Sequence, residues 1–135
     1  MPENEHRNCL LCGDLNPRSL GLRFEPHGDD GVRAEFQGHE DLQGYDGILH
    51  GGIIASLLDS AMTHCLFHRK VRAVTGDLQI RYKHSIPCNS TVDVQAKLVE
   101  SHPPLHRLKA RILMGRKTMA RGEARFMEID KKAAP

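Results

Sequence analysis

Aromatic residues are scarce in this 135-residue sequence. They make up 4% of it and include no tryptophan, so a row of rings on which nucleic-acid bases could stack is lacking. Nineteen Lys and Arg residues against 17 Asp and Glu residues leave a net charge of only +2. That is too small for a general nucleic-acid-binding protein, although a local basic patch could still meet a phosphorylated small molecule. No apolar run reaches the roughly 18 residues that would indicate a membrane-spanning helix. We therefore expect neither nucleic acid nor membrane as a partner.

The N-terminal region also lacks an apolar core of the kind found in signal peptides. Without a secretion signal, the four cysteines favour reduced thiols over a disulfide framework. Cys9 and Cys12 form a C-x-x-C pair with His6 nearby, which is half of a zinc site, but no second pair follows at zinc-finger spacing. We therefore expect a cytoplasmic protein with free thiols, no bound metal and no cofactor.

The length fits one domain spanning residues 1–135. Hydrophobic residues at 39% and charged residues at 27% are ordinary for a globular chain. We expect a loop-rich leader at residues 1–17 and a frayed tail at residues 131–135. Because a chain of this size buries only about two-thirds of its unfolded surface, we also expect it to associate with a copy of itself.

One long helix is predicted over residues 52–67. Between Gly47 and His68, Asp59 is the only charged residue apart from histidines. At helical spacing the apolar residues fill an arc of roughly 220°, which is far wider than the stripe of a surface helix. Most of this helix must therefore be covered, and a curved sheet is the natural cover. The remaining arc holds Ser56, Asp59, Ser60 and Thr63.

After this helix the apolar pattern changes to period two. Four segments alternate apolar and polar residues, at 77–83, 92–98, 107–114 and 120–126. Such segments are typical of strands with one wet face, and the short turns between them indicate an antiparallel meander. Two shorter strand signals precede the helix at 20–25 and 32–36. The fold class is therefore α+β, a curved antiparallel sheet wrapped around one helix, with small inward residues (Ala120, Gly122, Ala124) allowing a close approach.

The predicted helix begins with a pattern of residues that could take part in catalysis. Gly51 and Gly52 leave the first backbone N–H groups unobstructed, and these groups lack intrahelical acceptors and carry the positive end of the helix dipole. An oxyanion or a polarised carbonyl oxygen could bind there. Asp59, surrounded by apolar residues on the same helix, is a candidate base or nucleophile. A tight helix start and a solvated acid would be the purely structural interpretation of the same residues.

These residues resemble a known family. His50-Gly51-Gly52 followed nine positions after the histidine by Asp59, on a helix that precedes the strands, is similar to the hotdog-fold acyl-CoA thioesterases of the PaaI-like (phenylacetic acid degradation) group. The segment 75–82, the turn 85–87 and the leader 9–21 extend the resemblance over nearly the whole chain. It implies a hotdog fold with one long central helix, and an enzyme that hydrolyses acyl-CoA thioesters to a free acid and CoA.

The resemblance also implies roles for single residues. Asp59 matches the catalytic carboxylate, which acts either as general base on water or as nucleophile. Gly51 matches the residue whose backbone N–H polarises the thioester carbonyl. His50 would shape the turn and hydrogen-bond within the site. Thr75 matches a Ser/Thr position that the neighbouring subunit supplies to position the attacking water.

Relatives of this kind form homodimers with one continuous sheet, often paired into homotetramers, with active sites at the subunit interface. The resemblance therefore implies the same assembly here. It further implies that the nucleotide of CoA lies along a basic surface. Candidates for that surface are Arg69, Lys70, Arg107 and Lys109.

One position departs from the family pattern. Related enzymes often carry Asn or Gln six residues before the histidine, facing the catalytic acid, and Gly44 stands there in this chain. Either Gln43 or Asp46 substitutes, or the water is held differently, or the activity is weakened. We count Gln43 and Asp46, together with Gly52, as substrate-binding candidates. The departure supports an alternative function, a hotdog module that binds acyl-CoA without turnover.

The remaining histidines favour structural roles. His64 and His68 lie four residues apart on the helix, but the acid of a metalloprotease motif does not stand between them. We expect them at the surface or an interface. His102 and His106 flank a Pro-Pro turn, and we expect a solvated loop there.

Overall fold

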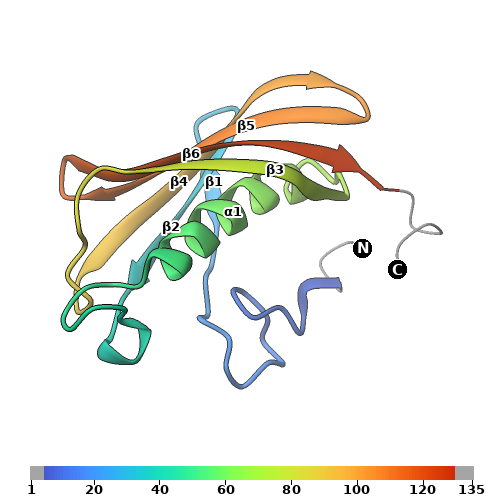
Figure 1. Cartoon of the computed structure of the whole chain (residues 1–135). Coiled ribbons are helices and arrows are strands. Elements are labelled where there is room, and N and C mark those ends of the chain that lie inside the picture. Colours follow the sequence, from blue (N-terminus) through green and yellow to red (C-terminus); the bar gives the residue numbers. More distant parts are fainter. Residues whose placement is uncertain (1–4, 130–135) are drawn as a thin grey trace.

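A computed structural model describes residues 5–129 as one antiparallel sheet curved around a single long helix (Figure 1). The expected frayed tail lies outside the described residues. The helix α1 covers Gly51–Phe67, and a short 3-10 helix, η2, covers Glu40–Leu42. The strands are β1 (Glu25–His27), β2 (Gly31–Gln37), β3 (Ala73–Tyr82), β4 (Thr91–His102), β5 (Leu105–Met114) and β6 (Lys117–Glu128). The predicted α+β class is confirmed, and α1 begins one residue before the predicted helix.

The strand order corrects the predicted meander. The sheet runs β1-β2-β4-β5-β6-β3, and every neighbouring pair is antiparallel. Strands β4, β5 and β6 form a meander as predicted, but β3 pairs with β6 at the far edge while β2 takes the place beside β4. The prediction was wrong because period-two alternation shows which face of a strand is buried and does not show which strand lies next to it.

The predicted strand at 20–25 is also wrong. Only its last residue, Glu25, belongs to a strand, the three-residue β1. The residues before it pair with the leader instead, because the N–H groups of Leu20 and Leu22 donate to the carbonyls of Leu10 and Leu11 at 2.9 and 3.0 Å. With Leu22 only 2% exposed, this segment's apolar residues fill the core without joining the sheet.

The core lies between α1 and the concave face of the sheet. Leu57, Leu58, Ala61 and Met62 of the helix are fully buried. The predicted close approach is present, since a Cβ on Gly122 of β6 would lie 3.6 Å from Leu58 Cδ1. The prediction that most faces of the helix are covered is therefore confirmed, and the buried part of α1 is wider than the predicted apolar arc. Ser60, assigned to the polar arc, is buried as well.

Strand β3 forms a long open edge beside the helix. Nine of its ten residues pair with β6 on one side, and within residues 5–129 no strand pairs with its other side. Val74 and Tyr82 on this strand are 48% and 53% exposed. A long edge of this kind is a template for pairing with another chain unless it is protected.

No helix among the described residues combines the length and apolar character that crossing a membrane requires.

Candidate functional site

His50 fixes the geometry at the start of α1. Its Nδ1 accepts a hydrogen bond of 2.8 Å from the Gly52 N–H, so the imidazole caps the helix. A Cβ on residue 52 would lie only 3.0 Å from this nitrogen, which explains the glycine. His50 thus shapes the turn, but the Gly52 N–H is already taken and is not a free donor for a substrate.

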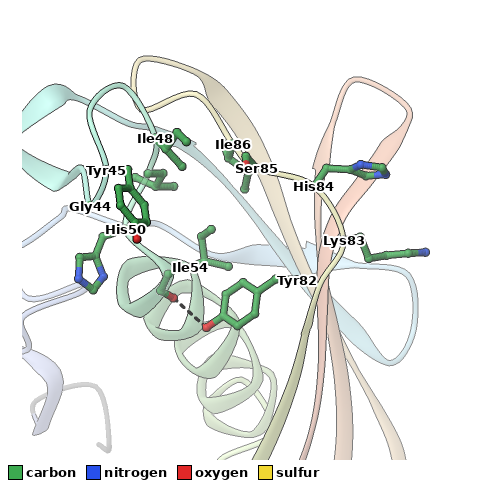
Figure 2. A pocket seen from close by; sticks show the side chains of 12 residues that line it. Gly44, Tyr45, Ile48, His50, Ile54, Tyr82, Lys83, His84, Ser85 and Ile86 are labelled. Atoms are coloured by element: carbon green, nitrogen blue, oxygen red, sulfur yellow. Dashed lines mark hydrogen bonds between the residues drawn. The ribbon is translucent and has the colours of Figure 1, made fainter.

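Gly51 presents the backbone donor that the sequence singled out. It is the first residue of α1, and a helix leaves its first N–H groups without intrahelical acceptors. Among the hydrogen bonds of residues 5–129, none takes up the Gly51 N–H. The Gly51 carbonyl accepts from the Tyr82 hydroxyl at 3.0 Å, which ties the end of β3 to the helix start (Figure 2).

A pocket of about 580 Å³ opens at this helix start. Figure 2 shows that its wall comes from the loop before α1, the first turn of α1 and the loop after β3. Ten of its twelve lining residues were not among the sequence candidates, and these include Tyr45, Tyr82, Lys83 and His84. Tyr82 could have been found, because it continues the inward phase of Leu78 and Ile80. Tyr45 and His84 lie in loops, where no periodicity indicates their direction.

Asp59 and Thr75 meet two turns further along the helix. The Thr75 hydroxyl donates to Asp59 Oδ1 at 2.6 Å, and the Thr63 hydroxyl donates to the Asp59 carbonyl at 2.9 Å. The first contact lies within one chain, so Thr75 and Asp59 of the same copy belong to the same half of the site. Asp59 is half-buried, with one carboxylate oxygen held by Thr75.

Asp59 and Gly51 do not share a pocket in one chain. Eight residues separate them on α1, which is a rise of about 12 Å. Accordingly, Asp59 and Thr75 do not line the pocket that contains Gly51. The helix start with Gly51 and the Asp59–Thr75 pair are therefore both present in one chain, but they lie apart.

Gln43 and Asp46 were candidates to replace the Asn or Gln that is absent at position 44. The structure places both in the loop before α1. The Gln43 side-chain oxygen accepts from the Gly47 N–H at 2.8 Å, so it is used within its own loop. Asp46 is exposed in the same loop. Gly44 lies against His50, whose Cδ2 would be 3.5 Å from an added Cβ. Nothing in this loop places an amide opposite Asp59.

The structure does not gather the four basic candidates into one surface. Arg69 pairs with Asp30 at 2.9 Å, and Lys70 follows it beyond the end of α1 that lies furthest from Gly51. The Arg107 side chain lies 3.6 Å from Glu100. Lys109 lies 3.5 Å from Glu123, in a second hollow on the sheet face opposite the helix. The other cations of that hollow are Arg81, Lys83, Lys97, Arg111 and Arg121.

Two histidines differ from their expected surroundings. His106 is 4% exposed and lies between Ser101 Oγ at 2.7 Å and Glu128 Oε2 at 2.8 Å, so it is not in a solvated loop. Burial, with smaller contributions from His6 and His68, lowers the pKa of His64 to about 4. Its Nε2 lies 3.1 Å from Cys12 Sγ, and this contact joins the leader to α1.

Comparison with known proteins assigns the fold and finds a family match over part of the chain. Residues 46–102, which include Gly51, Asp59 and Thr75, match the Thioesterase superfamily. The structure superposes on the thioesterase superfamily protein RHA08564 with a TM-score of 0.84, at 22% identity over 90% of this chain and 63% of that one. The chain therefore has the hotdog fold, and its residues 46–102 are similar to the Thioesterase superfamily.

Other hotdog structures give the same architecture. The PaaI protein of the E. coli phenylacetic acid degradation operon matches with a TM-score of 0.76, at 17% identity over 82% of this chain and 81% of that one. Zebrafish thioesterase superfamily member 2 matches with 0.78, at 18% identity over 93% and 94% of the two chains. At these identities the likeness concerns the fold.

Curated relatives match this chain over part of its length. The mouse acyl-coenzyme A thioesterase THEM4 is 43% identical over 63 residues, which are 47% of this chain and 27% of the mouse protein. The bovine protein of the same name is 36% identical over 63 residues. The chain thus covers about a quarter of the length of these relatives.

Proposed function

We propose that this protein hydrolyses acyl-CoA thioesters to a free acid and CoA. The observation that carries the proposal is that α1 presents both a Gly51 N–H without a hydrogen-bond partner among residues 5–129 and a carboxylate, Asp59, held by Thr75. The superfamily match and the acyl-CoA thioesterase relatives support the same reaction. The acyl group stays open, because few aromatic side chains line the pocket.

Gly51 supplies the electrophilic half of the reaction. The thioester carbonyl oxygen accepts a hydrogen bond from the Gly51 N–H, at the positive end of the helix dipole. When water adds to the carbonyl carbon, negative charge develops on that oxygen, and a fixed donor stabilises it without reorganisation. The C–S bond then breaks and the sulfur leaves as CoA thiolate.

Asp59 supplies the basic half. Its carboxylate takes a proton from the attacking water as the new C–O bond forms. Thr75 holds one carboxylate oxygen at 2.6 Å and so orients the other toward the water. Thr75 is therefore a positioning residue, and Asp59 is the catalytic one.

One active site takes its two halves from two copies of the chain. Thr75 lies at the Asp59 end of β3, and Tyr82 at the opposite end lies on Gly51. If two open β3 edges pair antiparallel about a two-fold axis, the Thr75 end of one strand lies beside the Tyr82 end of the other. Each Asp59 then faces the Gly51 of the second copy, and the two sheets become continuous. A tetramer of two such dimers stays a prediction.

CoA release from a panel of aliphatic and aromatic acyl-CoAs tests the proposal. Asp59→Asn keeps the shape of the side chain and removes its basicity, so we expect kcat to fall by about 10²–10⁴. Asp41→Asn, an exposed acid of η2, is the matched control and keeps the native rate. A reagent blank on protein alone is needed because four cysteines can react. Full turnover by Asp59→Asn would show that the mechanism is wrong.

A second candidate function is binding of acyl-CoA without turnover. It is favoured by the loop around Gly44, because a glycine stands where the resemblance implies an Asn or Gln, and the side-chain oxygen of the adjacent Gln43 is bonded to the Gly47 N–H. This function predicts that acyl-CoAs raise the melting temperature while no CoA is released. A melting temperature that no acyl-CoA changes would argue against it.

A further inference from the structure

Four metal-ligand side chains meet outside the proposed catalytic site. The donor atoms of His6, Cys9 and Cys12 all lie within 4.8 Å of one another. A fourth side chain, His64 of α1, places its Nε2 3.1 Å from Cys12 Sγ. The sequence shows the first three together, but His64 lies 52 residues after Cys12 and joins them only because the leader folds along the helix (Figure 1).

The distances suit a tetrahedral site. With metal–sulfur and metal–nitrogen bonds of about 2.3 and 2.0–2.1 Å, sulfur and nitrogen ligands of zinc lie roughly 3.6 Å apart. Cys12 Sγ lies 3.7 Å from His6 Nδ1 and 3.1 Å from His64 Nε2. Cys12 Sγ thus lies near this spacing from an imidazole nitrogen on each of two sides, while Cys9 Sγ lies within 4.8 Å of the Cys12 and His6 donors.

Backbone hydrogen bonds fix the shape of the loop that carries Cys9 and Cys12. The Leu11 N–H donates to Cys9 Sγ at 3.3 Å. The Gly13 N–H donates to the Cys9 carbonyl at 2.8 Å and closes the loop. A Cβ on residue 13 would lie 2.4 Å from the Cys9 nitrogen, so only glycine permits this turn directly after Cys12.

An apolar shell surrounds the cluster. Phe24 stacks on His64 and Phe67 packs edge-on against His6, both with ring centroids 4.7 Å apart. Cys12 is itself only 8% exposed. A shell of this kind limits solvent access to a metal and fixes the orientation of its imidazole ligands.

We propose that His6, Cys9, Cys12 and His64 bind one Zn²⁺ ion, which fastens the leader to the C-terminal half of α1. Two sulfur and two imidazole donors form a ligand set that tetrahedral zinc prefers, and four protein ligands make the site structural, with no open position. Binding converts the Cys9 and Cys12 thiols to thiolates and releases their two protons. The proposal does not depend on the proposed thioesterase activity, which places no residue of this cluster in the reaction.

Zinc content measured on the full chain tests the site. Reduced protein is incubated with excess Zn²⁺, desalted and analysed for metal. We expect about one zinc per chain in the native protein and in His68→Gln, whose changed residue lies one turn from His64 on the same helix. His64→Gln and Cys12→Ser should lose most of this zinc. Well under a tenth of an equivalent in the native protein, or equal zinc in His64→Gln, would overturn the proposal.

Cobalt replacement keeps the test valid if a variant folds poorly. Native protein loaded with Co²⁺ in place of zinc should show thiolate-to-cobalt charge transfer together with the intense visible bands of a tetrahedral ion. Zinc should also raise the melting temperature of the native protein and of His68→Gln. An octahedral cobalt spectrum without thiolate charge transfer in the folded native protein would overturn the site independently of any substitution.

Discussion

Replacing Gly51 with proline removes one atom group, the N–H that we assign to the thioester carbonyl. Position 51 is the first residue of α1, where proline is favoured because the N–H has no helical partner. His50 before it has φ −59° and ψ 133°, an extended conformation that a following proline accepts. A Cβ at position 51 would lie 3.6 Å from Tyr82 Cε1, which is ordinary contact. The fold should therefore tolerate Gly51→Pro.

The expected loss follows from the role of a single oxyanion donor. Removing one such donor costs about 10²–10³ in kcat, equivalent to about 2.7–4 kcal/mol. Gly51→Ala adds the Cβ but keeps the N–H, so it is the matched control and should retain most of the native kcat. The assay is steady-state CoA release, with melting temperatures recorded for both variants.

The ratio of the kcat values of Gly51→Pro and Gly51→Ala tests whether the Gly51 N–H binds the thioester carbonyl. A Gly51→Pro protein that melts like the native one and keeps kcat within about threefold of Gly51→Ala would refute the assignment of the N–H, because no donor of the expected strength would have been lost. A large rise in KM with unchanged kcat would refute it as well, since it would show lost ground-state binding only.

Substitutions at three other positions test the site and the core beneath it. Thr75→Val removes the hydrogen bond to Asp59 and should lower kcat on the order of tenfold, whereas Thr75→Ser should restore it; equal rates for both would deny the positioning role. Tyr82→Phe removes the hydroxyl that donates to the Gly51 carbonyl and should destabilise by about 0.5–1.5 kcal/mol in denaturant unfolding, so an unchanged midpoint would count against that contact. Leu57→Ala empties a fully buried position and should cost about 2–5 kcal/mol of unfolding free energy, and a smaller loss would mean that the core closes around the space.

Local patterns predicted the helix and the buried faces of the strands well. The stretch from Ile53 to Leu66 is apolar around most of the helix, and only a surrounding sheet can bury it, so its sequence implies its environment. The inward phase of β4, β5 and β6 likewise follows from alternation, because every second side chain of a strand points to the same face. Strand order has no such local signal, which is why β3 was placed beside β4.

The position of Thr75 shows a second limit. Counting back in twos from Leu78 puts Gly76 and Val74 on the helix side, and Thr75 on the outer face. A register shift between Thr75 and Asp77 reverses the phase, so Thr75 faces the helix and meets Asp59. Alternation alone would have missed this contact, and the resemblance that named Thr75 did not show that one chain makes it. The contact between His64 and Cys12 of the leader could not be predicted either, because only tertiary packing brings these residues together.

The most direct test of the account mixes two inactive variants. Asp59→Asn and Gly51→Pro chains are unfolded together, refolded at equal amounts and assayed for CoA release. If each active site takes Gly51 from one copy and Asp59 from the other, a mixed dimer contains one intact site, and random pairing returns roughly a quarter of the native rate. Homodimers of either variant stay near their own low rates. A mixture that forms mixed dimers and shows no activity above the average of the two variants would contradict a site shared between copies.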